Sequence, residues 1–230
     1  RAPGQLRRLV RALGDLYGDS PIACHHDFAQ ASLNTADFPS STRFVQPSIR
    51  TGWGKWSLVD AFLRALETLY QAADPDIFFL ISAADYPAAP AEKVIADLSQ
   101  PDVDAWIDAF DLEQALGGCV DPGEPHLAHH RTLNNIRLAR QRYLRALLKL
   151  PIIRFRPPAF SSTAERYPRL GRTTRALPFA SPLSPFGPDY RCFVGSQWFT
   201  ARRSVAAKLL HPDTKARQLQ HYLWSRVVPD

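Results

Sequence analysis

The residues of this chain best suited to ligand chemistry follow a run of apolar side chains. Residues 77–81 are five consecutive apolar residues, rich in β-branched and aromatic types, and Ser82-Ala83-Ala84-Asp85-Tyr86-Pro87 comes next. Such a run is typical of a strand buried on both faces of a sheet. A central strand of an open α/β sheet ends in this way where its carboxyl edge forms a ligand crevice. Asp85 is therefore a candidate ligand-binding carboxylate, although on these residues alone an Asx turn is the simpler interpretation.

Histidines gather at two places that could hold a metal ion. His126, His129 and His130 cluster in a predicted loop, and His25-His26-Asp27 ends a predicted short strand. The three loop histidines lack the glutamate of a zincin helix, so a metallohydrolase is kept only as a minor alternative.

Two Asp-x-Asp triplets have the pattern that holds a diphosphate through a metal ion. They are Asp74-Pro75-Asp76 and Asp102-Val103-Asp104. Both precede predicted strands, which is the wrong edge of a sheet for a ligand, so we expect surface turns there and no metal site. A bound diphosphate would then be neutralised by Lys and Arg.

Several common nucleotide and hydrolase motifs are missing from the sequence. It contains neither a glycine-rich dinucleotide loop nor a P-loop, and it contains no Gly-x-Ser-x-Gly elbow. The first two absences argue against an NAD-binding or P-loop protein, and the third argues against an α/β-hydrolase.

Charge is distributed unevenly along this chain of formal net charge +6. Residues 101–125 hold seven acids and no Lys or Arg, whereas residues 131–175 hold twelve bases and one acid, Glu165. This asymmetry favours an anionic ligand, a membrane surface or nucleic acid, although a solvated basic face is the ordinary explanation. A non-catalytic module that binds an anionic polymer through residues 131–175 is therefore our alternative function.

The elements that must position these residues alternate between helices and strands. In the first half we predict a helix at 5–17 stopped by Gly18, strands at 22–24 and 44–45, a helix from Ser57 capped with Asp60, the strand at 77–81, a helix from Pro90 and a strand at 103–110. This order points to an α/β fold with a mainly parallel sheet and crossover helices. The second half is predicted to contain a basic helix at 135–150, a loop at 151–190 with eight prolines, a strand at 192–199, a helix capped by Thr200 and a helix at 215–224.

Four short blocks, in this order and at similar spacing, resemble the core-2/I-branching glycosyltransferase family. They are His25-x-Asp27, Trp53-Gly54-x-x-Ser57-Leu58, Ser82 to Pro87, and Gly195-Ser196-Gln197-Trp198-Phe199 followed by Arg202-Arg203. The family includes β-1,6-N-acetylglucosaminyltransferases and peptide O-xylosyltransferases, and Ala83-Ala84-Asp85 resembles the xylosyltransferase branch. The resemblance extends from about Leu6 to Asp230.

The resemblance implies a GT-A-like, Rossmann-like nucleotide-sugar fold and inverting, metal-independent transfer. The donor would be UDP-xylose or UDP-N-acetylglucosamine and the acceptor a hydroxyl of a glycan or protein, without a cofactor or nucleic acid. Carried over by position, the donor-binding residues are His25, Asp27, Trp53, Gly54, Ser57 and Asp85. The acceptor-side residues are Gly195, Ser196 and Trp198, and the candidate phosphate contacts are Arg202 and Arg203, for which a solvated helix face is the competing interpretation.

We predict one glycosyltransferase domain over residues 1–230, incomplete at both ends. It would comprise a donor-nucleotide half at 1–110, an irregular basic, proline-rich insertion or lid at 111–190, and an acceptor-side part at 191–230. In the family, a glutamate that acts as general base follows a segment like Val228-Pro229-Asp230 at once. The catalytic residue is therefore expected just beyond Asp230, and these 230 residues are expected to be inactive in transfer.

The three cysteines, Cys24, Cys119 and Cys192, are too few for a disulfide scaffold and favour a reducing compartment, as in bacterial relatives. No run of about eighteen apolar residues occurs. We expect a cytoplasmic protein, with peripheral membrane association left open. The Golgi lumen is the alternative if an N-terminal anchor has been lost.

Overall fold

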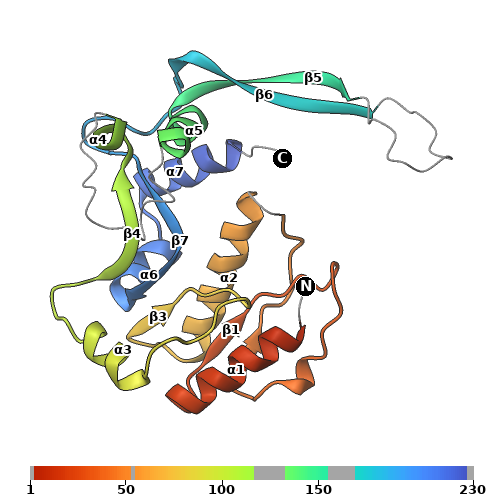
Figure 1. The fold of residues 1–230 in the computed structure, drawn as a ribbon, viewed down its shortest axis with the longest axis vertical. Coiled ribbons are helices and arrows are strands. Elements are labelled where there is room, and N and C mark those ends of the chain that lie inside the picture. Colours follow the sequence, from red (N-terminus) through yellow and green to blue (C-terminus); the bar gives the residue numbers. More distant parts are fainter. Residues whose placement is uncertain (1–2, 53–54, 117–132, 155–168, 227–230) are drawn as a thin grey trace. The chain divides into compact units, whose positions relative to one another are not determined.

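The computed structural model describes residues 3–52, 55–116, 133–154 and 169–226 (Figure 1). Within these residues the fold is mixed α/β, with helices and three small sheets. The chain forms two compact units. The first comprises Arg1–Ala109 and Gly195–Arg217, and the second comprises Phe110–Val194 and Gln218–Asp230.

The first unit begins with a helix, a parallel strand pair and a second helix. These are α1 (Pro3–Tyr17), β1 (Ile22–Cys24), the 3-10 turn η1 (Thr35–Asp37), β2 (Thr42–Phe44) and α2 (Trp56–Ala72). α1 ends as predicted, because Gly18 takes the left-handed conformation at φ 66° and its N–H donates to the Gly14 carbonyl at 2.9 Å. β1 and β2 run parallel, with Ile22 opposite Thr42.

A three-stranded sheet has the order β3 (Ile77–Phe79), β7 (Phe193–Arg202), β4 (Ala105–Asp111). β3 and β7 are antiparallel, with Ile77 opposite Arg202. Backbone hydrogen bonds from Arg202 to Asp104 and from Leu112 to Cys192 join opposite ends of β7 and β4, so this pair is antiparallel too. The prediction of a mainly parallel sheet is therefore wrong: among the described strands, β1 and β2 are the parallel pair. A strand from late in the chain separates β3 from β4, and the order of elements in the sequence does not reveal that placement.

One face of this sheet packs against α2 and α6 (Arg203–Leu210). The buried residues of this core are Leu66, Phe78, Ala201 and Ala206. Phe78 meets the Phe199 ring edge-on, with the centroids 5.6 Å apart. β3 lies at the edge of the sheet and buries only Phe78, whereas Phe79 is 47% exposed. The expectation of a strand buried on both faces is therefore wrong.

Three helix predictions need correction in detail. Lys55 stands at the N-cap of α2, and the Ser57 hydroxyl accepts from the Gly52 N–H, so Ser57 and Asp60 form no capping box. Thr200 lies within β7, and α6 begins after Arg202 without a side-chain cap. The helix predicted from Pro90 is α3 (Ala91–Leu98), with Pro90 itself at the N-cap; it buries Ala91 and leaves Ile95 exposed.

The described residues of the second unit form two helices, a hairpin and most of the last helix. They are α4 (Leu112–Leu116), α5 (Leu133–Tyr143), β5 (Arg145–Arg154), β6 (Arg169–Ala180) and α7 (Thr214–Ser225), which begins in the first unit. Its core is built on Leu112, Ala115, Ile136 and Cys192. The buried Asp111 carboxylate caps α4 by accepting from the Glu113 N–H at 2.9 Å and pairs with Arg191 at 3.0 Å.

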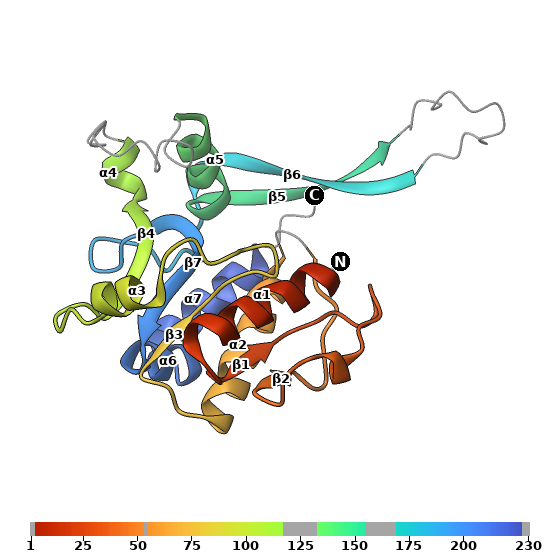
Figure 2. The ribbon, with the colours of Figure 1, turned by 60° about the horizontal axis from the view of Figure 1, so that its bottom comes forward.

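The predictions for the middle of the chain were wrong in two respects. The helix expected at 135–150 ends at Tyr143, and part of the loop expected at 151–190 forms the antiparallel β5–β6 hairpin (Figure 2). In the hairpin, Leu150 lies opposite Thr173 and Pro151 opposite Arg172. Residues 147–153 are rich in Leu and Ile, which a strand accepts once it is paired with a second strand. That second strand, residues 169–180, lies too far along the chain for local periodicity to reveal the pairing.

Candidate functional site

Three of the predicted donor-binding residues meet at one short backbone segment, residues 49–52. His25 Nε2 accepts from the Ile49 N–H at 3.1 Å, and the Ser57 hydroxyl accepts from the Gly52 N–H at 3.1 Å. Asp27 Oδ2 accepts from the Thr51 N–H at 2.7 Å. His25 and Asp27 follow β1, and the segment follows β2, so these groups lie at the carboxyl ends of the parallel pair. We call His25, Asp27, Ser57 and residues 49–52 the strand-end cluster.

Gln30 completes this cluster and was not identified from the sequence. Its side-chain amide donates to Asp27 Oδ2 at 2.6 Å and to the Thr51 carbonyl at 2.8 Å. Thr51 is thus held at both its N–H and its C=O. The available signal was the turn that Asp27 starts, in which its Oδ1 accepts from the Ala29 N–H at 3.1 Å. Such a turn brings the side chain at the fourth position back towards the first.

Aromatic rings pack behind this turn. The His26 ring meets Phe28 edge-on at 4.8 Å, Phe28 meets Phe44 at 6.3 Å, and Phe44 meets Phe38 at 5.2 Å. His26 Nε2 also lies 2.8 Å from the Ala31 carbonyl, to which it donates. These contacts fix the turn after β1 and hence the position of Asp27.

The electrostatics of the cluster match its hydrogen bonds. Burial lowers the pKa of His25, with Asp27 opposing and Arg64 reinforcing that shift. A neutral imidazole is required, because Nε2 accepts a hydrogen bond from the Ile49 N–H. The pKa of Asp27 is lowered, chiefly by the hydrogen bond from the Thr51 N–H. At neutral pH the cluster therefore contains one neutral histidine, His25, and one ionised carboxylate, Asp27.

Two arginines near the cluster were also missed. Arg50 lies within the held segment and is exposed. Arg64, on α2, is half-exposed, forms an ion pair with Asp60 at 3.3 Å and is close enough to influence His25. Neither belongs to a motif, and only the fold of β2 and α2 brings them to this end of the sheet.

Asp85 is not brought into the strand-end cluster. Its Oδ2 accepts from the Ser82 N–H at 2.6 Å, and its own N–H donates to the Ser82 carbonyl at 3.1 Å. The Ser82 hydroxyl in turn accepts from the Ala84 N–H at 3.1 Å. The carboxylate thus closes the turn that follows β3.

The three predicted acceptor-side residues lie on β7, apart from the strand-end cluster. A Cβ on Gly195 would lie 1.8 Å from the Asp108 carbonyl oxygen, so this glycine allows close approach of β7 and β4. Ser196 Oγ accepts from the Trp198 N–H at 3.1 Å, and the Trp198 side chain is partly exposed.

Arg202 and Arg203, the candidate phosphate contacts, are both engaged by protein groups. Arg202 donates to the carbonyls of Val103 at 2.7 Å, Gln100 at 2.6 Å and Leu98 at 3.1 Å. Its guanidinium also lies over the Trp106 ring. These contacts fix the segment between α3 and β4 to the end of β7.

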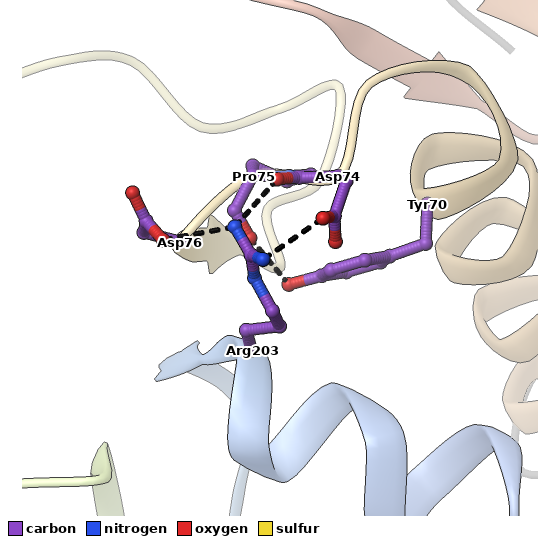
Figure 3. A network of polar contacts seen from close by, with 5 residues as sticks. All are labelled: Tyr70, Asp74, Pro75, Asp76 and Arg203. Carbon is purple, nitrogen blue, oxygen red and sulfur yellow. Dashed lines mark hydrogen bonds and ion pairs between the residues drawn. The ribbon is translucent and has the colours of Figure 1, made fainter.

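Arg203 pairs with both carboxylates of the Asp74-Pro75-Asp76 triplet, at 2.8 and 2.9 Å (Figure 3). The Tyr70 hydroxyl donates to the Pro75 carbonyl at 3.0 Å in the same network. Asp74 adopts a positive φ of 41°, as expected of a tight turn. The guanidinium of Arg203 thus neutralises the two carboxylates of this triplet, whose sequence resembles a metal-binding motif.

Several predicted residues lie outside the described part of the chain. They are Trp53, Gly54, Cys119, His126, His129 and His130. Among the described residues, no group of three or more His, Cys, Asp or Glu side chains could hold a metal ion. In the same residues, no helix is both long enough and apolar enough to span a membrane.

The two described cysteines are free thiols. Burial raises the pKa of Cys24 to about 11 and that of Cys192 to about 12. Both are therefore protonated at neutral pH, and neither has the properties of a thiolate nucleophile.

No protein-family model and no curated protein matches this chain.

Proposed function

We propose that this chain is an inverting, metal-independent glycosyltransferase with a GT-A-like arrangement of its nucleotide-binding elements. It would transfer xylose or N-acetylglucosamine from a UDP-sugar to a hydroxyl of a glycan or protein. The observation that carries the proposal is the strand-end cluster. His25, Asp27 and Ser57 belong to two separate blocks of the family resemblance, and all three hold the same backbone segment. That segment lies at the carboxyl ends of parallel strands, where α/β folds bind nucleotides.

The donor diphosphate would be neutralised by arginine. Arg50 and Arg64 lie at or near the strand-end cluster and have exposed surface. Arg64 pairs with one acid, Asp60, whereas Arg203 pairs with two and Arg202 donates to three backbone carbonyls away from the cluster. Guanidinium groups match phosphate oxygens in bidentate geometry. We therefore assign the diphosphate to Arg50 and Arg64 in place of Arg202 and Arg203.

The reaction would be a single displacement. The acceptor hydroxyl attacks the anomeric carbon while a general base removes its proton, and the bond from that carbon to the UDP oxygen breaks. One displacement inverts the anomeric configuration. Arg50 and Arg64 would stabilise the charge that develops on the leaving diphosphate, which is where preorganised cations lower a barrier most.

A thermal-shift panel of UDP, UDP-xylose, UDP-N-acetylglucosamine and GDP-mannose tests the donor class. A ligand that binds only the native state raises its stability, so the UDP compounds are expected to raise the melting temperature and GDP-mannose is not. Arg50→Gln and Arg64→Gln should each reduce the shift, whereas Arg8→Gln on α1 should leave it unchanged. Equal shifts with all four compounds, or none with any, would refute a UDP-sugar donor.

A further inference from the structure

The segment from α5 to β6 carries charge of one sign. α5, β5 and β6 each contain three Lys or Arg residues and no Asp or Glu. Arg137, Arg140 and Arg142 of α5 are exposed, and so is Arg175 of β6. A surface of this kind attracts an anionic partner.

The same segment exposes large apolar side chains. Leu138 is 51% exposed, Leu148 is 43% exposed, and Phe179 is 57% exposed. Leu183, just after β6, is 78% exposed. Leu148 lies directly opposite Arg175 in the hairpin, so an exposed apolar side chain and an exposed cation are cross-strand neighbours. A soluble anionic ligand gives these apolar side chains nothing to bury against.

The hairpin is fixed at its base. Arg226 donates to the carbonyls of Arg142 and Arg145, and the Tyr222 hydroxyl donates to the Tyr143 carbonyl at 2.6 Å. Apart from the pairing of β5 with β6, the hairpin packs mainly against α5 (Figures 1 and 2). An isolated two-stranded hairpin is marginally stable in water, so further contacts along it would stabilise it.

We propose that α5 and the β5–β6 hairpin dock on the surface of an anionic lipid bilayer. A bilayer interface accepts cations at its headgroups and apolar side chains at the acyl boundary, which matches the mixed surface described above. Single-stranded RNA would instead require several aromatic side chains for base stacking. Among the exposed large hydrophobic residues that the structure describes in this segment, Phe179 is the one aromatic. The surface works independently of any nucleotide sugar.

Vesicle co-sedimentation tests the charge contribution. The full chain should bind vesicles of phosphatidylcholine mixed with phosphatidylglycerol and should not bind phosphatidylcholine alone. The variant Arg137→Gln/Arg140→Gln/Arg142→Gln keeps good helix formers and should bind about 10- to 100-fold more weakly, since each cation near an anionic surface contributes severalfold. The control Arg8→Gln/Arg11→Gln/Lys93→Gln removes the same charge from exposed positions of the first unit and should bind like the wild type.

A second variant, Leu148→Ser/Phe179→Ser, tests the contribution of the apolar side chains to vesicle binding. Its result holds whether or not the triple-Gln variant folds. It should weaken vesicle binding several-fold while leaving any binding to heparin or single-stranded RNA unchanged. The proposal fails if the wild type binds both kinds of vesicle equally or neither. It also fails if the Ser variant binds anionic vesicles as tightly as the wild type, or if the protein binds RNA or heparin but not vesicles.

Discussion

His25 makes the strand-end cluster sensitive to pH. Its Nε2 accepts from the Ile49 N–H, which only a neutral ring can do, and burial lowers its pKa. The unfolded chain has the ordinary value of about 6.5, so near and below that pH the unfolded state binds more protons. The stability that His25 contributes is therefore full above about 6.5 and is lost as pH falls through its folded value.

We predict that His25→Gln removes this pH dependence. Glutamine keeps an acceptor oxygen but does not titrate between pH 7 and 5. The free energy of unfolding, measured in urea at several pH values, should fall more steeply for the wild type than for the variant as pH drops below about 6.5. Parallel curves, or an NMR titration that places the pKa of His25 above its ordinary value, would contradict this account of the cluster.

The sequence pattern selects single residues only where they belong to an ordered motif. His25, Asp27 and Ser57 were selected by the resemblance, yet their contacts are with backbone N–H groups at residues 49–52. The sequence carries no direct signal for such contacts, because the acceptor side chains and the donor N–H groups are separated along the chain and meet only in the folded protein. Gln30, Arg50 and Arg64 were missed for the same reason.

At the scale of elements, Gly195 determines how closely β7 approaches β4. A Cβ there would meet the Asp108 carbonyl oxygen and the Ala109 Cα at 2.7 Å, and these backbone atoms cannot move without shifting β4. We predict that Gly195→Ala lowers the free energy of unfolding by about 3 kcal/mol or more, as overpacking between strands does.

Gly14→Ala is the matched control for this prediction. Gly14 lies within α1, and a Cβ there would have no neighbour within 4 Å. Alanine should therefore stabilise the helix by up to about 1 kcal/mol. Urea denaturation of both variants gives the two free energies of unfolding. Equal values for Gly195→Ala and the wild type would contradict the close approach of β7 to β4 at Gly195.

The Arg203 network joins the loop before β3 to the start of α6. Its ion pairs are solvent-exposed, with the Asp76 side chain 92% accessible, so solvent screens them strongly. We predict that Arg203→Gln costs no more than about 1 kcal/mol at low salt and that about 1 M NaCl removes most of the difference. A loss of several kcal/mol that persists in salt would mean that the network is buried in solution.

Elements were predicted well where their signal is local. α1, α7, β1, β4 and β7 lie close to the ranges predicted for them. The β5–β6 hairpin and the true end of α5 were missed, because residues 145–154 form a strand only when paired with residues 169–180. Strand pairing of this kind depends on a partner that no local window contains.

At the scale of the whole molecule, the sequence predicted a mixed α/β fold, and that prediction is confirmed. The predicted parallel order was wrong, since β7 comes from the C-terminal part of the chain and pairs antiparallel with β3. A GT-A-like arrangement rests on the β1–β2–α2 portion and remains part of the proposed function.

Titration calorimetry of UDP, in EDTA, into the wild type and Asp27→Asn tests the central claim most directly. The claim is that the strand-end cluster binds a uridine diphosphate without a metal ion. Wild type should bind, and Asp27→Asn should bind at least about tenfold more weakly, because the charge-assisted hold on Thr51 is lost. Asp19→Asn, an exposed aspartate outside the cluster, should bind like the wild type. No heat of binding, or binding that needs added Mn²⁺, would contradict the account.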